Sequence, residues 1–106
     1  MGKQSLKIIW TDPAKRDLKG IFDYLEKISL RIAENQIIRI VNRVSLLEDG
    51  FSKIGRKEML LQTFGNEYRY LVQDNYKIIY HQVEEKIVID MVFDTRRDPA
   101  KMKDKL

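Results

Sequence analysis

The sequence of 106 residues contains no cysteine, one histidine, two prolines and five glycines. Without cysteine there can be no disulfide framework, thiolate nucleophile or thiolate metal ligand, so stability has to come from packing. The one histidine, His81, has no cysteine to join it in a metal site, and no metal is expected. A lone strand histidine is also more often structural than catalytic, because a general base needs a positioned partner. No glycine-rich phosphate-binding loop is present, and no cofactor is expected.

Long hydrophobic runs are missing too. No stretch approaches the roughly 18 consecutive apolar residues that a membrane-spanning helix requires. Residues 1–6 are too few and too polar for a signal peptide. A cytoplasmic protein with no membrane partner is therefore expected.

The composition is typical of an ordered globular protein, with 43% hydrophobic and 34% charged residues. The length is close to the commonest domain size, and residues 1–106 are expected to form a single domain. The net charge of +4 favours encounter with acidic partners, either nucleic acid or an acidic protein. A solvated positive face without a function explains the same charge equally well.

The first half of the chain predicts a strand followed by two helices. Residues 6–10 are β-prone and stop before Asp12, which we expect to cap a helix with Pro13 at its first position. Apolar residues then recur at helical spacing over residues 13–28. Ser29 is the expected cap of a second helix that Gly50 ends. The short joint between them predicts a helical hairpin whose apolar stripes need a surface to cover them.

The second half predicts an antiparallel meander. Residues 51–67 form a basic loop leading into a short strand near the apolar residues 59–61. Three strand-like runs follow at residues 68–73, 76–83 and 86–93, and joints of two residues separate them. The last run is apolar on nearly both faces, so it should be central and covered on one side by the hairpin. The fold class is therefore α+β.

Several basic residues lie on or just beyond these strands: Arg69, Lys77, Arg96 and Arg97. Pairing across the joint at residues 74–75 places Arg69 opposite Tyr80 and on the same face. Such an arginine is either a rigid anion contact or a cover for the sheet edge. The tail, residues 94–106, is basic, and its lysines beyond Arg97 are expected to be mobile.

The order of elements and four segments resemble the RelE/ParE superfamily of bacterial toxins over residues 6–99. The segments are Trp10-Thr11-Asp12-Pro13-Ala14-Lys15-Arg16-Asp17-Leu18, Tyr68-Arg69-Tyr70-Leu71-Val72, Tyr76-Lys77-Ile78-Ile79-Tyr80 and Val92-Phe93-Asp94-Thr95-Arg96-Arg97-Asp98-Pro99. The resemblance implies the toxin of a type II toxin–antitoxin pair, with an α+β fold. It also implies neutralisation by an acidic antitoxin that wraps the helices and the sheet.

The resemblance leaves two activities open. RelE-like toxins cut messenger RNA on the ribosome, and their pattern would make Arg69, Lys77 and Arg96 catalytic. Leu71 stands where that pattern has a second lysine, and no Tyr or His follows Arg97, so half of the equipment for cleavage is missing.

The ending at residues 93–99 is instead similar to ParE-like toxins, which poison DNA gyrase by binding it. We therefore expect a ParE-like binding inhibitor whose target-binding residues are Arg69, Tyr80, Arg96 and Arg97. A ribosome-dependent endoribonuclease is the alternative, and an inactive superfamily member that still binds an antitoxin is a third.

Overall fold

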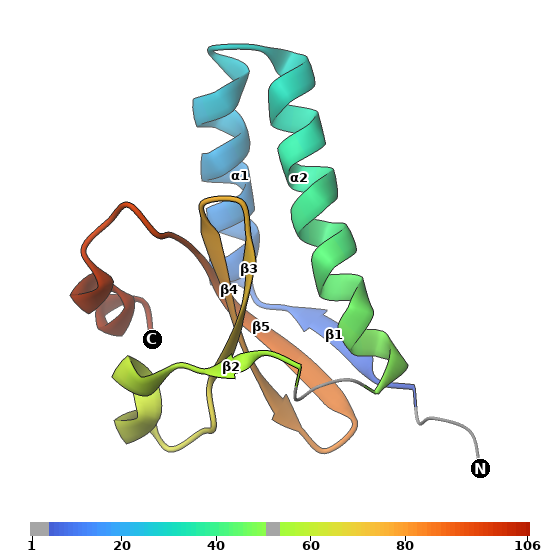
Figure 1. Cartoon of the computed structure of the whole chain (residues 1–106), viewed down its shortest axis with the longest axis vertical. Helices are drawn as coiled ribbons and strands as arrows, with labels where there is room; N and C mark the ends of the chain where they lie inside the picture. The colour runs from blue at the N-terminus through green and yellow to red at the C-terminus, as the bar shows by residue number, and fades with distance from the viewer. Residues whose placement is uncertain (1–4, 51–53) are drawn as a thin grey trace.

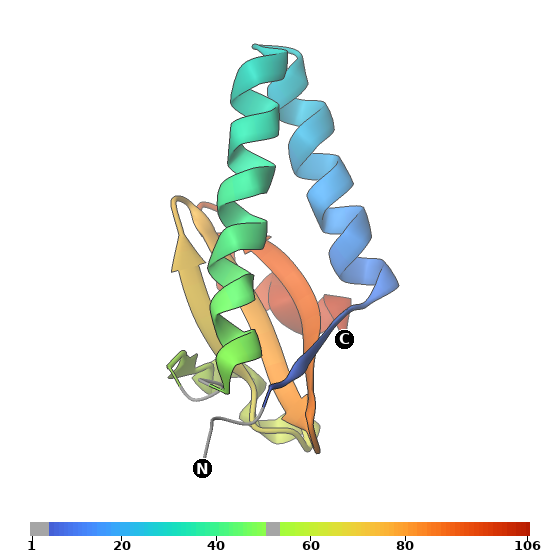
Figure 2. The same ribbon diagram turned by 90° about the vertical axis from the view of Figure 1, so that its right-hand side faces the viewer.

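A helical hairpin covers one face of a five-stranded sheet in the computed structural model, which describes residues 5–50 and 54–106 (Figure 1). Helix α1 spans Asp12–Glu26 and helix α2 spans Leu30–Ser45. Both views show that the tip of the hairpin projects well beyond the sheet (Figure 2). The predicted α+β architecture is confirmed. None of the helices among the described residues combines the length and the apolarity needed to cross a membrane.

Helix α1 begins one residue earlier than the sequence suggested. The Thr11 hydroxyl, rather than Asp12, caps the helix and accepts a hydrogen bond from the Ala14 amide at 3.2 Å. The same hydroxyl donates to the carbonyl of Ile89 at 2.8 Å. This second bond decides the cap, because it joins the start of the helix to a strand far along the chain. The helix also ends at Glu26, two residues before the predicted end at Ile28.

The cap of helix α2 is confirmed, since the Ser29 side chain accepts a hydrogen bond from the Ile32 amide at 3.3 Å. The α-helical part of this segment stops at Ser45, and the 3₁₀ helix η1 (Leu46–Asp49) continues it. Gly50 then ends the whole helical segment in the left-handed region, with φ of 85°. That conformation suits glycine because it has no Cβ.

The sheet has the order β1-β5-β4-β3-β2. Its strands are β1 (Lys7–Trp10), β2 (Arg56–Lys57), β3 (Arg69–Gln73), β4 (Tyr76–Val83) and β5 (Lys86–Asp94). Strand β5 pairs in parallel with β1 and antiparallel with β4, so it is central as predicted. The predicted register between β3 and β4 is also confirmed, with Arg69 opposite Tyr80. The short strand of the basic loop is β2, whereas the apolar residues expected to form it belong to the 3₁₀ helix η2 (Met59–Phe64).

The turn between β3 and β4 is fastened to helix α2. Asp74 adopts a positive φ of 55° in this turn. Its carboxylate accepts hydrogen bonds from Gln36 Nε2 and Arg39 Nε, each at 2.9 Å. Together with the Gln73 amide, these donors lower the pKa of Asp74, the Arg39 bond having the largest effect. The hairpin and the sheet are therefore joined by polar contacts as well as by apolar ones.

The sheet is covered on both faces. The face toward the hairpin buries Ile78, Ile87 and Ile89 against Ile40 and Val44 of helix α2. On the opposite face lie η2 and the C-terminal 3₁₀ helix η3 (Pro99–Lys105). The buried residues of this second layer are Leu61, Tyr68, Ile79, Met91, Phe93 and Met102. Helix η3 is anchored to this layer by Met102, which is fully buried.

We predict that Gly55→Ala destabilises the protein, whereas Gly20→Ala does not. A Cβ at Gly55 would lie 2.7 Å from the Tyr70 carbonyl oxygen and even closer to the Tyr80 hydroxyl, and backbone cannot move aside cheaply. Overpacking of this kind costs about 1–3 kcal/mol. Gly20 lies in α1, and a Cβ added there would meet no atom within 4 Å, so alanine should add up to about 1 kcal/mol through helix propensity. Urea unfolding of the two variants measures both changes, and equal midpoints would contradict the packing at Gly55.

Candidate functional site

The end of strand β5 carries a closed ion pair between Asp94 and Arg96. Arg96 Nε donates to Asp94 Oδ1 at 3.0 Å, and Nη2 donates to Oδ2 at 2.7 Å. The Arg96 amide also donates to Oδ1 at 2.9 Å. These bonds lower the pKa of Asp94 and raise the pKa of Arg96. The Arg96 guanidinium is therefore already paired with Asp94, although the Arg96 side chain remains 57% exposed.

Arg97 differs from Arg96 in having a free charge. Its backbone amide is fixed by the Asp94 carbonyl at 3.0 Å, and its guanidinium carbon lies 5.6 Å from the centre of the Phe93 ring. No carboxylate among the described residues lies within ion-pair distance of it. The side chain thus presents a cation that no ion pair occupies, beside an aromatic ring.

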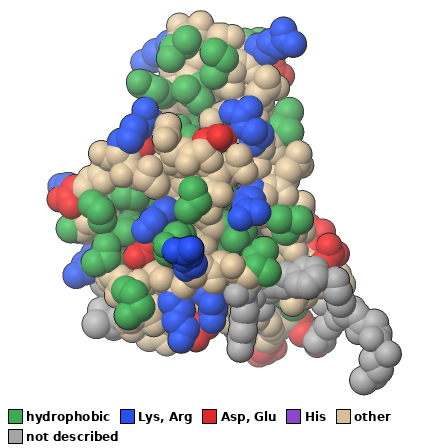
Figure 3. Space-filling model, in the orientation of Figure 1, with side chains coloured by type: hydrophobic (Ala, Val, Ile, Leu, Met, Phe, Trp, Pro, Cys, Tyr) green, Lys and Arg blue, Asp and Glu red, His purple; other side chains and the backbone are tan. Residues whose placement is uncertain are grey.

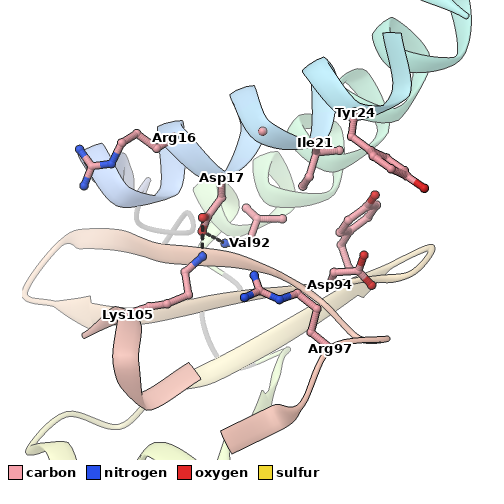
Figure 4. A pocket seen from close by; sticks show the side chains of 10 residues that line it. Arg16, Asp17, Ile21, Tyr24, Val92, Asp94, Arg97 and Lys105 are labelled. Atoms are coloured by element: carbon pink, nitrogen blue, oxygen red, sulfur yellow. Dashed lines mark hydrogen bonds and ion pairs between the residues drawn. The ribbon is translucent and has the colours of Figure 1, made fainter. Parts of the chain in front are cut away.

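Arg97 lines a pocket of about 250 Å³ between helix α1 and the end of the sheet. Figure 4 shows Arg97 and Asp94 on the sheet side, facing Ile21 and Tyr24 of α1 across the opening. Arg16 adds a second cation to the lining, and Tyr24 is 58% exposed. The pocket therefore combines aromatic surface with positive charge at the C-terminal end of β5.

Asp17 forms the base of this pocket and joins three elements. Its carboxylate accepts a hydrogen bond from the Val92 amide at 2.9 Å and forms an ion pair with Lys105 Nζ. Helix α1 is thereby tied to β5 and to η3 (Figure 4). The Lys105 side chain is engaged in this pair and is only 22% exposed. The apolar Met102 was the signal in the sequence that this segment is anchored.

Arg69 and Tyr80 are neighbours as predicted, and both side chains are engaged within the protein. Tyr80 is 1% exposed, and its hydroxyl accepts a hydrogen bond from the Gly55 amide at 3.0 Å. Burial raises the pKa of this tyrosine. Arg69 donates to the Gly55 carbonyl at 2.8 Å and to Glu67 at 2.9 Å, which lowers the pKa of Glu67. Both side chains therefore fasten Gly55, in the segment just before β2, to the sheet.

Lys77 lies on the opposite face of the sheet from Arg69. Its ammonium group pairs with Glu58 at 2.9 Å and sits 4.2 Å from the centre of the Tyr70 ring. Glu58 is itself buried, and sequence reasoning missed it because it is a single acid within a basic loop. Arg69, Lys77 and Arg96, the set of the ribonuclease pattern, therefore lie on two faces and one end of the sheet, each paired with a carboxylate.

His81 of β4 is in contact with Asp90 of β5. Its Nδ1 atom lies 2.7 Å from Asp90 Oδ2, and the two side chains are 12% and 10% exposed. The ring also packs edge-on against Tyr68, with centroids 5.4 Å apart. Burial raises the pKa of Asp90, and the contact with His81 opposes that rise. Over residues 5–50 and 54–106 no three His, Cys, Asp or Glu side chains gather where they could hold a metal ion.

The chain is similar to known proteins in sequence and in fold. Residues 8–99 match the family model described as "ParE toxin of type II toxin-antitoxin system, parDE". Among solved structures, a chain of the chromosomal ParDE TA system from P. aeruginosa superposes with a TM-score of 0.70 at 19% sequence identity. The match covers 86% of this chain and 97% of that one. A search of curated proteins found no match.

We predict that Arg96→Ala raises the carboxyl pKa of Asp94 toward its ordinary value of about 3.9. A carboxyl pKa that is lowered in the folded state stabilises that state at pH values above the ordinary pKa. This contribution to stability is lost as the pH falls through the lowered pKa of the folded state. The stability difference between the parent and Arg96→Ala should therefore be present near neutral pH and vanish in acid. Carboxyl NMR titration and urea unfolding at several pH values measure it. Lys19→Ala, which removes the distant pair with Asp23, should leave the Asp94 titration unchanged.

Proposed function

Because the chain belongs to the ParE toxin family of type II toxin–antitoxin systems, we propose that it arrests growth by binding DNA gyrase and that a cognate antitoxin neutralises it. The observation that carries this proposal is the rigid C-terminal end of β5, where Arg97 presents a free cation beside the pocket against helix α1. A binding inhibitor needs such a fixed, accessible contact and needs no catalytic group.

The positions of the basic residues favour a binder over a ribonuclease. Cleavage through a 2′-hydroxyl needs a base and several cations that converge on one phosphate. Arg69 and Lys77 lie on opposite faces of the sheet, and each is engaged by its own carboxylate. The chain's one histidine is partnered with Asp90. We therefore propose that the protein inhibits its target by binding to it and not by catalysis, with Arg97 as an anchoring contact.

The antitoxin half of the proposal is supported by apolar surface on the helical hairpin. Several large apolar side chains of the hairpin are between 40% and 67% exposed: Tyr24, Ile28, Leu30, Ile32, Ile38 and Val41. Exposed apolar surface of this kind on a chain with a net charge of +4 suits an acidic amphipathic segment. The neighbouring solved structure is itself part of a ParDE system.

We predict that Arg97→Ala relieves growth arrest much more than Arg96→Ala does. Arg97 is free to make a new contact, whereas Arg96 is committed to Asp94. Truncation of an arginine at an interface centre costs about 2 kcal/mol or more, which is a loss of roughly 30-fold in affinity. The measurements are colony formation after induction and inhibition of DNA supercoiling by purified gyrase.

Lys101→Ala, an exposed position in η3, is the control and should retain full toxicity. Folding of each variant is checked by circular dichroism and by retention of antitoxin binding. Equal toxicity of Arg97→Ala and the parent would remove Arg97 from the proposed contact.

We also predict that the purified protein makes no codon-specific cuts in messenger RNA in a reconstituted translation reaction. The reason is that Arg69 and Lys77 lie on opposite faces of the sheet, and each is paired with its own carboxylate. Primer extension on the messenger measures the cuts. Cleavage that is abolished by Arg69→Ala but retained in the surface variant Lys27→Ala would establish the ribonuclease alternative instead.

A further inference from the structure

The acidic residues that line the pocket beside Arg97 are already neutralised. Asp17 forms an ion pair with Lys105, and Asp94 forms one with Arg96. Each of these carboxylates therefore has a cation of its own. Any further cation in the lining adds positive charge that the pocket does not balance.

Two guanidinium groups of the lining are such further cations. Arg97 follows the end of β5, and Arg16 belongs to the first half of helix α1. Neither has a carboxylate within ion-pair distance among residues 5–50 and 54–106. Arg97 is also restrained, because its guanidinium carbon lies 5.6 Å from the centre of the Phe93 ring. The pocket thus offers two cations to an anionic ligand, and one of them is already held in place.

An exposed aromatic ring completes the lining. Tyr24 follows Arg16 by eight residues in helix α1, and a rise of about 1.5 Å per residue places them roughly 12 Å apart along the helix axis. Figure 4 shows Arg16 and Tyr24 at the two ends of the opening, and Arg97 on the opposite wall between them. Tyr24 is 58% exposed, so a face of its ring is available to a flat ligand.

We propose that this pocket binds a short segment of single-stranded DNA. The two guanidinium groups contact successive phosphates, and an unstacked base packs on the ring of Tyr24. Even the stacked strand of a duplex rises about 3.4 Å per nucleotide, so a lining of this length spans more than one nucleotide. The inference rests on the proposed function only for the source of the strand, which is the DNA that gyrase holds.

A nucleic acid fits this pocket better than an extended peptide does. The backbone amides at the end of β5 are already bonded, that of Thr95 to the Asn75 carbonyl and those of Arg96 and Arg97 to Asp94. A peptide strand would find these groups occupied, whereas a nucleic acid needs only cations and an aromatic platform.

The charge of the whole molecule acts in the same direction. Lysine and arginine side chains are spread over much of the face shown in Figure 3, and the net charge is +4. Such a field attracts a polyanion before any specific contact forms. The long-range charge therefore favours the encounter, and the pocket supplies the contact.

The test is fluorescence anisotropy of the full chain with two labelled DNA strands of equal length, one of thymidine nucleotides and one without bases. The thymidine strand should bind at least about tenfold more tightly, because only its bases can stack on Tyr24. Tyr24→Ala should abolish that preference, and Tyr24→Phe should retain it. If Tyr24→Ala fails to fold, Tyr24→Leu, which keeps apolar volume without a ring, replaces it.

The phosphate contacts are tested by the dependence of affinity on salt. Arg97→Gln and Arg16→Gln should each lower the slope of log affinity against log salt by about 0.7, the value for one phosphate of a single strand. The matched control is Arg31→Gln, an exposed arginine near the start of helix α2, and it should leave the slope and the preference for bases unchanged.

Equal affinity of the parent for the two strands, or a salt slope that neither Arg97→Gln nor Arg16→Gln changes, would overturn the proposal. So would displacement of the thymidine strand by inorganic phosphate at equal concentration, which would indicate a simple anion site. An RNA strand that binds more than tenfold more tightly than DNA would overturn DNA as the source. The titration requires neither gyrase nor growth arrest, so its failure leaves the proposed inhibition of gyrase untouched. A chain that binds the strand but does not inhibit supercoiling would count against gyrase alone.

Discussion

Strand β5 imposes the constraint on which the rest of the structure depends. This strand buries side chains on both faces of the sheet. Ile87 and Ile89 point toward the helices, whereas Met91 and Phe93, which follow the register shift against Ile79 and Tyr80, point away from them. A strand that is apolar on both sides is stable only if both sides are covered. The helical hairpin covers one face, and η2 and η3 cover the other. The short C-terminal helix η3 is therefore an integral part of the fold. The pocket beside Arg97 is rigid because it is built against this packed layer.

Most of the architecture could be predicted from local pattern, and the exceptions share one cause. Alternating apolar residues fixed the register of β3 against β4, because a slip by one residue would reverse every side chain. The start of helix α1 was misplaced because Thr11 and Asp12 are both good caps. The choice between them depends on the carbonyl of Ile89, which lies 78 residues away. The anchored tail was missed because one methionine stands among many charges, and only the apolar face of β5 gives that methionine a place.

The candidate site was predictable to a smaller extent. The sequence showed that Arg96 and Arg97 follow a rigid central strand. It did not show that Arg97 is more available than Arg96 for an outside contact, because that depends on the Asp94 carboxylate pairing with Arg96. Both Arg69 and Tyr80 make hydrogen bonds to the backbone of Gly55, and no sign of these contacts is visible in the sequence because Gly55 has no side chain. Charge counts have the same limit. A net charge of +4 does not say which cations are already neutralised by Asp17, Glu58, Glu67 or Asp94.

The parallel pairing of β1 with β5 has a consequence for the newly made chain. Lys7 pairs with Lys86, so the first strand to leave the ribosome waits for the last one before it can join the sheet. Until then helix α1 lacks the strand against which it packs, and a separation of this length makes closure slow. The pocket cannot exist before closure, because Tyr24 and Arg97 come from opposite ends of the chain. Synthesis therefore passes through a long interval in which the polypeptide displays the hairpin but has not yet assembled the surface around Arg97.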